Sequence, residues 1–419
     1  MVKIKVFFIL FLIALTACNK QVNNKDKSNK NNQQEENKQA QKKPATPKVV
    51  LITLDGVRWQ ELFSGADSLL VSNDKYVKDT AVLASHFWAK KPSKRREVLF
   101  PFMWSYIARN GVIYGNRKEG NKVNLTNNRW FSYPGYSEIL CGLADDKRIK
   151  SNAKIDNPNK TILELVNNSE VYKNKVAAFA SWDVFPSIIN RTRSKLPINA
   201  GFESADRTTG ISAIEKQLNS YQKQTPSPWH NVRLDVFTHN YALNYMKEKH
   251  PDLVYIAYGE TDDFAHDGKY DQYLNAIKRS DTFIKDLWNF VQNDTYYKNN
   301  TTFIITTDHG RGTVPLETWK HHGNNLKDHG KTYTIKGSDQ VWLAAFGSGI
   351  KKQGEIKNEN QLYSNQIATT IENILKVDVL TGEASKKNYH LLIKLFYTLI
   401  QKKRLPGKRK SFVLFLYCR

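Results

Sequence analysis

Hydrophobic residues recur along the chain in short continuous runs rather than in strict alternation with polar residues. Five such runs stand out, at 48–55, 176–181, 252–260, 301–310 and 340–347. An unbroken apolar run of this length is typical of a parallel strand buried on both faces of a sheet. Between the runs, apolar residues recur at helical spacing, as at 160–168 and 270–292. Strands that alternate with helices predict an α/β fold with a mainly parallel central sheet flanked by helices.

The N-terminal part of the chain follows a different pattern. Residues 1–17 place two lysines before a continuous apolar stretch, which is typical of a signal peptide. The stretch ends in the tetrad LTAC at Cys18, which resembles a bacterial lipobox, so we expect cleavage before Cys18 and acylation of Cys18. An ordinary signal peptide with an incidental Cys18 is the alternative. Residues 18–47 are rich in Asn, Lys and Gln, which predicts a disordered tether. Together these features predict a lipid-anchored protein of the cell envelope, on the periplasmic or cell-surface side of a bacterial membrane.

The net charge of +23 is concentrated at the two ends of the chain. Residues 386–419 hold ten Lys or Arg and no acidic residue, residues 18–48 carry +5 and residues 1–17 carry +2, so that residues 49–385 carry only +6. A nucleic-acid groove needs its positive charge on the folded domain, and we therefore expect no nucleic-acid binding. Residues 386–419 also mix apolar and basic segments, which suits either a membrane-surface element or an extension without fixed structure.

The composition excludes several classes of protein. An apolar content of 40% is too high for a wholly disordered chain, and three cysteines are too few for a disulfide-stabilised miniprotein. No apolar run reaches the roughly 18–20 residues that a membrane-spanning helix needs, which excludes a polytopic membrane protein. The class of protein that the composition leaves open is a folded domain with a catalytic or binding function.

Acidic residues and histidines follow three of the predicted strands. Asp55 ends the first run, Asp262 and His266 follow the third, and Asp308 and His309 follow the strand that starts at 301. The carboxyl ends of parallel strands meet at one edge of a sheet, where open α/β folds bind their ligands. Asp262 and His266 are four residues apart, so a helical turn would place them on one face. Mixed carboxylate and imidazole donors suit zinc, with manganese, iron or magnesium as alternatives.

These residues lie in five motifs whose order matches that of a known family. The motifs are KVVLITLDGV around Asp55, FSYPGYSEILCG around Ser132, GETDDFAHDG around Asp262, TTDHGRG around Asp308 and WKHHG around His322. Together they resemble the alkaline phosphatase superfamily, most closely its nucleotide pyrophosphatase/phosphodiesterase-like bacterial lipoproteins, whose fold is related to that of sulfatases. The resemblance covers residues 48–375 and implies an alkaline phosphatase-like catalytic domain, which we place at 48–385.

The resemblance also implies two divalent metal ions and a serine nucleophile. One ion, zinc before manganese or magnesium, would be bound by Asp262, His266 and His322. The other would be bound by Asp55, Asp308, His309 and the hydroxyl of Ser132. Ser132 would attack the phosphorus of a phosphodiester or a phosphomonoester, and water would then release the phosphoryl group from the serine.

Several positions keep a second interpretation. His321 and His329 compete with His322 as the metal ligand. Asn152 and Tyr133 are candidates for substrate binding, Asn152 through a phosphate oxygen. The aromatic residues beside the nucleophile either line a leaving-group pocket or belong to the core: Trp130, Phe131, Tyr133 and Tyr136. The histidines outside the motifs are expected on the surface or in the core: His86, His230, His239, His250 and His390.

Three other functions fit part of the pattern. A sulfatase would carry Arg at the fifth position of its C/S-x-P-x-R motif, where this chain has Tyr136. A phosphoglycerate mutase-like enzyme would insert a second domain between nucleophile and later ligands, but only about 130 residues separate Ser132 from Asp262. A catalytically inactive binding lipoprotein is disfavoured because all seven expected positions carry competent residues.

Overall fold

The computed structural model describes residues 46–206, 210–328 and 331–381. The predicted signal peptide, the lipidation site Cys18, almost all of the tether and the extension at 386–419 lie outside these residues, as do His329 and His390.

An eight-stranded sheet forms the centre of the described domain. Its strand order is β12 (Gly354–Glu355), β2 (Gly111–Tyr114), β11 (Leu343–Gly347), β7 (Thr301–Thr306), β1 (Lys48–Leu54), β6 (Leu253–Tyr258), β4 (Val176–Ala180) and β5 (Ile198–Ala200). The five strands from β7 to β5 are parallel, and every residue of β1, β6 and β7 is buried. The predicted mainly parallel sheet is confirmed, and its most apolar strands occupy the middle because helices cover both faces there.

The run at 340–347 departs from the prediction of one parallel strand. It divides into β10 (Gln340–Val341), which belongs to a small sheet with β3 (Asn121–Asn124) and β13 (Asn360–Tyr363), and β11, which is antiparallel to both β7 and β2. Among the described residues between β7 and β11, no helix crosses the sheet, so the chain re-enters beside β7 from the edge at which it left. Such a return is antiparallel, because a parallel return needs a crossover.

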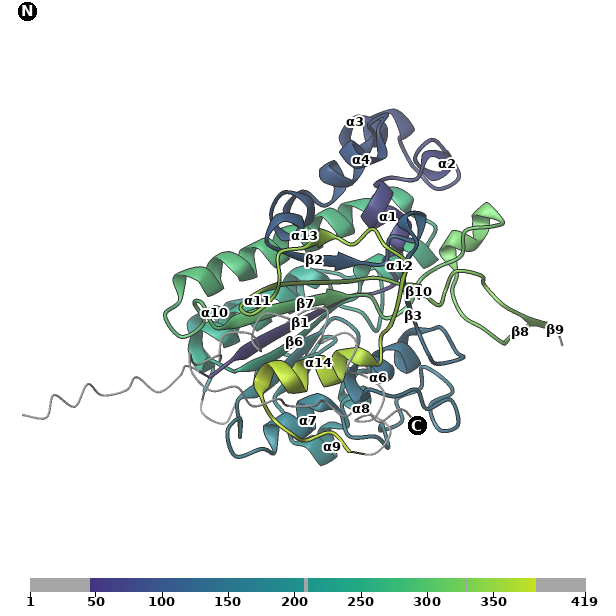
Figure 1. The fold of residues 1–419 in the computed structure, drawn as a ribbon. Helices are drawn as coiled ribbons and strands as arrows, with labels where there is room; N and C mark the ends of the chain where they lie inside the picture. Colours follow the sequence, from purple (N-terminus) through teal and green to yellow (C-terminus); the bar gives the residue numbers. More distant parts are fainter. Residues whose placement is uncertain (1–45, 207–209, 329–330, 382–419) are drawn as a thin grey trace, which may run out of the picture. The chain divides into compact units, whose positions relative to one another are not determined.

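Two layers of helices cover the two faces of the sheet (Figure 1). Alternate residues of β1, β6 and β7 pack on one face against α11 (Asp235–Lys249) and α13 (Tyr270–Asn293), and on the other face against α6 (Ser132–Cys141), α7 (Ile162–Asn167), α8 (Phe185–Ile188) and α14 (Gln366–Leu375). The predicted helix at 270–292 is α13, whose buried residues recur every three or four positions. The predicted helix at 160–168 is the shorter α7.

The remaining elements are short. They are the helices α1 (Trp59–Ser64), α2 (Ser68–Val71), α3 (Thr80–Phe87), α4 (Pro92–Leu99), α5 (Ala108–Asn110), α9 (Arg191–Ser194), α10 (Ala213–Gln224) and α12 (Glu260–His266), the π-helix η1 (Met103–Ile107), the 3₁₀ helices η2 (Arg117–Glu119) and η3 (Leu316–Lys320), and the hairpin strands β8 (Leu326–Asp328) and β9 (Lys331–Tyr333). Among the described residues, no helix combines the length and the apolar character that a bilayer crossing requires.

Candidate metal centre and active site

The three strands that carry acidic residues at their carboxyl ends are neighbours in the sheet. β1 lies between β6 and β7, and its register pairs Leu54 with Tyr258 and Thr53 with Thr306. Asp55 therefore emerges beside α12 on one side and beside Asp308 on the other. Asp55 is held there by its backbone N–H, which donates to the Tyr258 carbonyl at 3.0 Å. The topology thus gathers the predicted residues at one edge, as the carboxyl-end rule expects.

Ser132 reaches the same edge from the N-terminus of α6. Its Oγ lies 3.3 Å from Nε2 of His309, and the residue is buried. The approach depends on Gly135, one turn later, because a Cβ at that position would lie 2.2 Å from the carbonyl oxygen of Asp308. Glycine is therefore the one residue that lets the first turn of α6 lie directly on the end of β7.

Asp55, Asp308 and His309 form one compact group of donors. His309 Nε2 lies 3.3 Å from Asp55 Oδ1 and 3.5 Å from Asp308 Oδ2. His309 Nδ1 donates to the carbonyl oxygen of Gly310 at 2.9 Å, which leaves Nε2 facing the two carboxylates, where it would bind a metal ion in place of a proton. A backbone partner of this kind is the usual way in which a metal-binding histidine is oriented.

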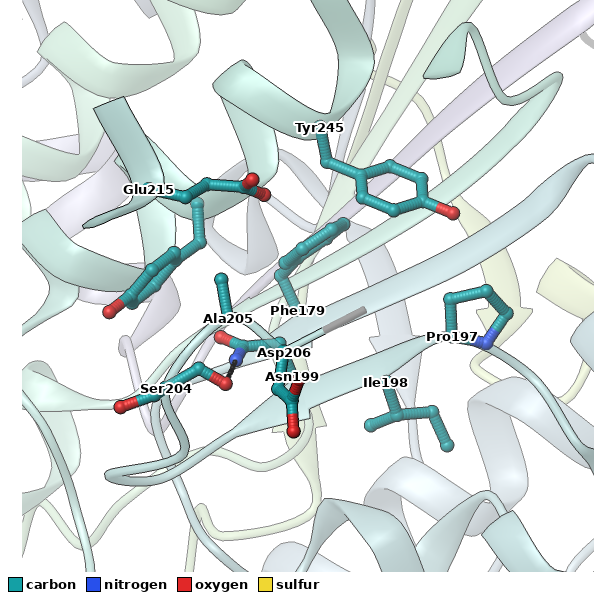
Figure 2. Close-up of a pocket in the computed structure, with 10 residues that line it drawn as sticks. Phe179, Pro197, Ile198, Asn199, Ser204, Ala205, Asp206, Glu215 and Tyr245 are labelled. Carbon is teal, nitrogen blue, oxygen red and sulfur yellow. Dashed lines mark hydrogen bonds between the residues drawn. The ribbon is translucent and has the colours of Figure 1, made fainter. Parts of the chain in front are cut away.

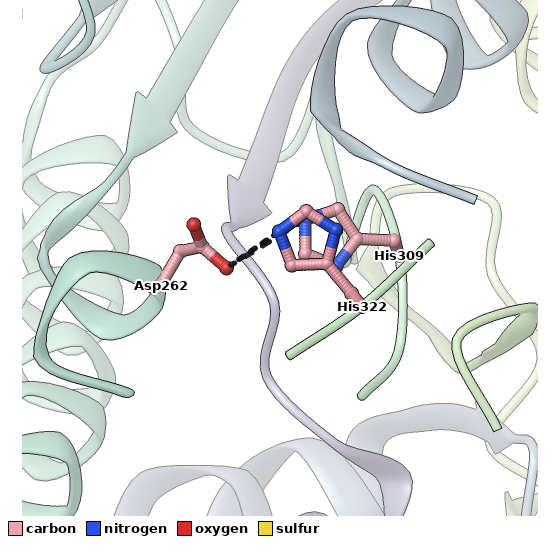
Figure 3. Close-up of side chains that lie close together, drawn as sticks. All are labelled: Asp262, His309 and His322. Carbon is pink, nitrogen blue, oxygen red and sulfur yellow. Dashed lines mark ion pairs between the residues drawn. The ribbon is translucent and has the colours of Figure 1, made fainter. Parts of the chain in front are cut away.

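Asp262, His266 and His322 form an adjoining group. Asp262 lies 3.2 Å from His266 Nε2 and 3.6 Å from His322 Nε2, and the two imidazole nitrogens are 3.0 Å apart. Figure 3 shows Asp262 facing His322, whose ring stacks on that of His309 at 3.8 Å between centroids. The structure therefore brings His322 into the cluster, while the adjacent His321 is exposed, with its ring centroid 6.2 Å from that of His266.

Burial and mutual repulsion set the charge of the cluster. Burial and the neighbouring Asp262 raise the pKa of Asp55, and burial and Asp55 raise the pKa of Asp308 well above its usual value. The burial of Asp262 also opposes its ionisation, but His266, Arg311 and His322 outweigh it and hold its pKa well below the usual value. Burial would lower the pKa of His309, but Asp308 and its other acidic neighbours raise it to about 9. Three buried carboxylates in contact need a compensating positive charge.

The donor set fits divalent metal ions. Asp55 Oδ1 and Asp308 Oδ2 are buried and accept no hydrogen bond, which is costly unless a cation binds there. The donor atoms of Asp55, Asp308 and His309 all lie within 4.8 Å of one another, and so do those of Asp262, His309 and His322. Oxygen and imidazole nitrogen in these numbers suit zinc, and manganese or magnesium less closely.

Two residues that the sequence did not assign support the ligands. The Tyr136 hydroxyl donates to Asp55 Oδ2 at 2.7 Å. The guanidinium of Arg311, completely buried, pairs with Asp262 and donates to the carbonyl oxygens of Trp319 and Lys320, just before His322. The TTDHGRG motif contained a signal for Arg311, because an arginine beside buried ligands must itself find partners.

The cluster opens into a cleft of about 330 Å³. It is lined by Asp55, Ser132, Asn152, Trp182, Asn231, Val232, Gly259, Asp262, Asp263, His266 and His322. Asn152, a predicted substrate-binding residue, therefore lies in the cleft, where its Oδ1 accepts from the backbone N–H of Tyr133 at 3.0 Å. The side chain of Tyr133 is buried, and its hydroxyl donates to the carbonyl oxygen of Ile155 at 2.6 Å. Tyr133 thus touches the site through its backbone and belongs with Tyr136 to the core.

Four histidines outside the motifs lie away from the cluster. His239 is buried and stacked on Phe283 at 4.3 Å, and His250 lies 3.2 Å from a carboxylate oxygen of Asp294. His86 and His230 are exposed.

A second, smaller cavity of about 100 Å³ lies between the edge of the sheet and helices α10 and α11 (Figure 2). Its walls are Phe179, Pro197, Ile198, Asn199, Ser204, Ala205, Asp206, Glu215, Tyr241 and Tyr245. It shares no residue with the cleft and contains none of the predicted ligands, so we assign the chemistry to the cleft.

Comparison with known families identifies the family of this chain. The family model of type I phosphodiesterase / nucleotide pyrophosphatase matches residues 143–407, more than half of the chain. The chain belongs to this family. The matched range contains Asp262, His266, Asp308, His309 and His322. The predicted family is confirmed. Membership of the type I phosphodiesterase family also supports the prediction that the protein is a hydrolase. Comparison with curated proteins gives no significant match.

Solved structures share the fold of this phosphodiesterase family member at low sequence identity. The lipoteichoic acid synthase LtaP from Listeria monocytogenes has 10% identity and a TM-score of 0.50, over 81% of this chain and 75% of its own. Murine ectonucleotide pyrophosphatase / phosphodiesterase 5 in complex with AMP has 15% identity and a TM-score of 0.48, over 83% and 100%. A protein of the alkaline phosphatase superfamily from Vibrio parahaemolyticus has 12% identity and a TM-score of 0.45, over 80% and 68%. The predicted α/β fold is confirmed, and the LtaP structure shares it.

Proposed function

We propose that the protein is a metal-dependent hydrolase of phosphate esters, with Ser132 as its nucleophile. One observation carries the proposal: the Ser132 hydroxyl lies 3.3 Å from His309, at the edge of two adjoining groups of carboxylates and imidazoles whose carboxylates are buried. A hydroxyl in such a position becomes nucleophilic when metal ions lower its pKa. The family match supports a phosphate ester as the substrate.

Two divalent ions, zinc before manganese or magnesium, would be held by the two groups. Asp262, His266 and His322 would hold one, and Asp55, Asp308, His309 and Ser132 the other. When bound, such ions supply positive charge that stabilises the serine alkoxide and the phosphoryl oxygens.

The chain itself supplies the nucleophile and its orientation. Ser132 occupies the first position of α6, where the helix dipole favours negative charge on Oγ. Oγ loses its proton to solvent and forms the bond to phosphorus, the bond from phosphorus to the ester oxygen breaks, and the alcohol leaves with a proton from water. Water then cleaves the serine phosphate and regenerates the hydroxyl. Asn152 Oδ1 accepts from Tyr133 N–H in the cleft, and its amide nitrogen would donate to a phosphoryl oxygen.

The test uses the mature full-length chain. Hydrolysis of bis-para-nitrophenyl phosphate, para-nitrophenyl phosphate and para-nitrophenyl sulfate is measured with zinc, after chelator treatment, and in Ser132→Ala. We expect chelator-sensitive cleavage of a phosphate ester that Ser132→Ala abolishes while zinc remains bound. Ser137→Ala, on the same helix and outside the cleft, is the matched control. Cleavage of the sulfate alone would move the protein to the sulfatases, and a near-normal rate in Ser132→Ala would refute the nucleophile.

We also propose that the mature protein is anchored to a bacterial membrane by acylated Cys18. The support is the apolar stretch that ends at Cys18 and the polar segment that follows it. Metabolic labelling with a fatty acid, followed by membrane fractionation, should show label and membrane association that Cys18→Ser loses. A Cys18→Ser protein that stays labelled would contradict the anchor.

A further inference from the structure

A groove of about 240 Å³ lies at the end of β7 that is remote from the metal cluster. Thr301, the first residue of β7, lines this groove, whereas Asp308 and His309 follow the last residue of the strand. The extended chain from Thr301 to Asp308 spans roughly 20 Å. The groove shares no lining residue with the catalytic cleft, and we call it the distal groove.

Aromatic side chains form the apolar part of the distal groove. They are Tyr106, which is half-buried, and the more deeply buried Trp288 and Phe346. The ring centroids of Tyr106 and Trp288 are 5.6 Å apart, and those of Trp288 and Phe346 are 4.9 Å apart. Phe102 stacks on Tyr106 at 5.2 Å, with 6° between the ring planes. Because these rings hold one another in place, a ligand that packs on them costs little side-chain entropy.

A buried carboxylate joins the two elements that carry the main rings. The π-helix η1 carries Tyr106, and α13 carries Trp288. Asp281, also on α13, accepts hydrogen bonds from the N–H groups of Phe102 at 2.6 Å and Met103 at 2.9 Å, where η1 begins. Single π-helical turns are rare and are frequent at functional sites. The distal groove is therefore built on a fixed junction between η1 and α13.

The turn after β11 is fixed against the start of β7 and forms another wall of the groove. The Ser348 N–H donates to the Thr301 carbonyl at 2.9 Å, and Thr302 Oγ1 donates to the Ser348 carbonyl at 2.7 Å. Gly347 has a φ of 99°, and a Cβ there would lie 2.4 Å from the Thr301 carbonyl oxygen. The backbone that presents Ser348 to the groove is thus held in one position.

Polar side chains line the remainder of the groove. They are the amides of Asn110, Gln292 and Asn299 and the hydroxyl of Ser348. Within the described part of the chain, the side chains of Gln292, Asn299 and Ser348 have no hydrogen-bond partner, and each of these groups can both donate and accept. The groove has one charged side chain, the exposed Lys352, and no Asp or Glu of the described residues lines it. A cationic ligand would therefore find no opposite charge there.

We propose that the distal groove binds a ring of an uncharged sugar chain and so holds the protein on a glycan. The aromatic rings pack against the C–H face of the sugar, and the free amides and the serine hydroxyl bind its hydroxyl groups. A β-1,4-linked glucose-type ring fits this lining because its substituents are equatorial and both of its faces are apolar. The catalytic cleft lies at the other end of β7 and stays open while the glycan is bound.

Isothermal titration calorimetry of the full-length mature protein tests the proposal with three probes. Cellotriose and chitotriose are uncharged trisaccharides of β-1,4-linked rings, and sorbitol has similar hydroxyl groups but no ring. We expect both trisaccharides to bind with a Kd on the order of 1 mM and sorbitol not to bind. Sugar binding is measured without a phosphate ester, so the result does not depend on the proposed phosphoesterase function. In a separate assay, chitotriose should leave the hydrolysis of bis-para-nitrophenyl phosphate unchanged.

Variants of the lining locate the bound sugar. Tyr106→Ala should weaken binding at least about tenfold through the lost aromatic contact. Gln292→Ala and Asn299→Gly should each weaken it about fivefold through a lost hydrogen bond. These two changes keep the test valid if Tyr106→Ala does not fold, because Gln292 contributes no hydrogen bond to the described fold and glycine readily adopts the φ of 66° at Asn299.

Asn289→Ala is the matched control, at an exposed position of α13 outside the groove, and should bind the trisaccharides as the wild-type protein does. Absence of trisaccharide binding up to about 20 mM would overturn the proposal. It would also be overturned by equal affinities of the wild-type protein and the Gln292 and Asn299 variants. Competitive inhibition of ester hydrolysis by chitotriose would place the sugar in the catalytic cleft and overturn the distal groove as its site.

Discussion

Replacement of Tyr136 by Phe tests whether the hydrogen bond from Tyr136 orients the Asp55 carboxylate for metal binding. The variant removes one oxygen atom, and with it the 2.7 Å hydrogen bond to Asp55 Oδ2. That bond is the one that the Asp55 carboxylate accepts among the described residues, since Oδ1 accepts none. Tyr136 is 1% exposed, so water has little room to replace the hydroxyl.

The expected magnitude follows from two independent estimates. A buried hydrogen bond to a charged group contributes about 1.5–3 kcal/mol, which corresponds to roughly a 10- to 100-fold change in an equilibrium constant. Loss of a residue that orients a metal ligand typically weakens metal binding by about 10- to 100-fold. We therefore expect the zinc Kd at the Asp55 group to rise by about 10- to 100-fold in Tyr136→Phe.

The effect should also depend on pH, with a defined sign. Burial raises the pKa of Asp55, and the hydrogen bond from Tyr136 opposes that rise. Without the bond, the pKa of Asp55 moves further up, so protons compete more strongly with the metal for the carboxylate. The affinity lost in Tyr136→Phe should therefore be largest at low pH and shrink as the pH increases.

The assay is competition for zinc with a chelator of known affinity, at about pH 6.5 and about pH 8.5. Tyr172→Phe is the matched control: it removes a buried hydroxyl that donates to the Leu375 carbonyl at 2.9 Å, away from the cluster. Equal zinc affinities of Tyr136→Phe and the wild-type protein at both pH values would refute the reasoning. A loss of the same size in Tyr172→Phe would show a general effect on stability instead.

Three further substitutions test buried residues that hold α6, α12 and α13 in position. Gly135→Ala places a Cβ 2.2 Å from the Asp308 carbonyl and should lower kcat by about 100-fold with circular dichroism unchanged; an unchanged kcat would mean that α6 tolerates a shift. Asp235→Ala removes the acceptor of the Gly259 N–H, at 2.8 Å, and should lower the free energy of unfolding in urea by about 1–3 kcal/mol. Burial raises the pKa of Asp281 to about 7, so the folded state binds its proton more tightly than the unfolded state and stability falls as pH rises from about 4 to about 7. Asp281→Asn should flatten that fall by up to about 4 kcal/mol, measured by urea unfolding across this range, and an equally steep fall in both proteins would contradict the assignment.

The arrangement of the ligand-bearing strands was predictable because it depends on local patterns. Continuous apolar runs identify β1, β6 and β7, and the residues that follow such runs must meet at one edge. The direction of each strand was harder to predict than its position in the sequence. The run at 340–347 is as apolar as the others, but β11 is antiparallel because its direction depends on the path of the preceding loop, which hydrophobicity does not encode.

The partners of the supporting residues could not be predicted, because they depend on contacts between distant segments, although the TTDHGRG motif did contain a signal for Arg311. Tyr136 meets Asp55 across 81 positions of sequence, and Arg311 meets Asp262 across 49. Tyr133 adjoins the nucleophile in sequence and was therefore predicted to bind substrate, but the first turn of α6 directs its side chain into the core. Trp182 enters the cleft from the segment after β4, which no single motif describes.

The central position of β1 has a consequence for how the chain acquires its site. β1 is the first strand of the domain to be synthesised, yet both of its neighbours, β6 and β7, come from the C-terminal half. The hydrogen bond from the Gly56 N–H to Asp308 joins residues 252 positions apart. Closing so long a loop is slow, and one hydrogen-bonding edge of β1 stays unpaired until β7 has been made. The cluster is consequently complete only when β1, β6 and β7 lie side by side, and uptake of metal ions by both groups would report that this pairing has been reached.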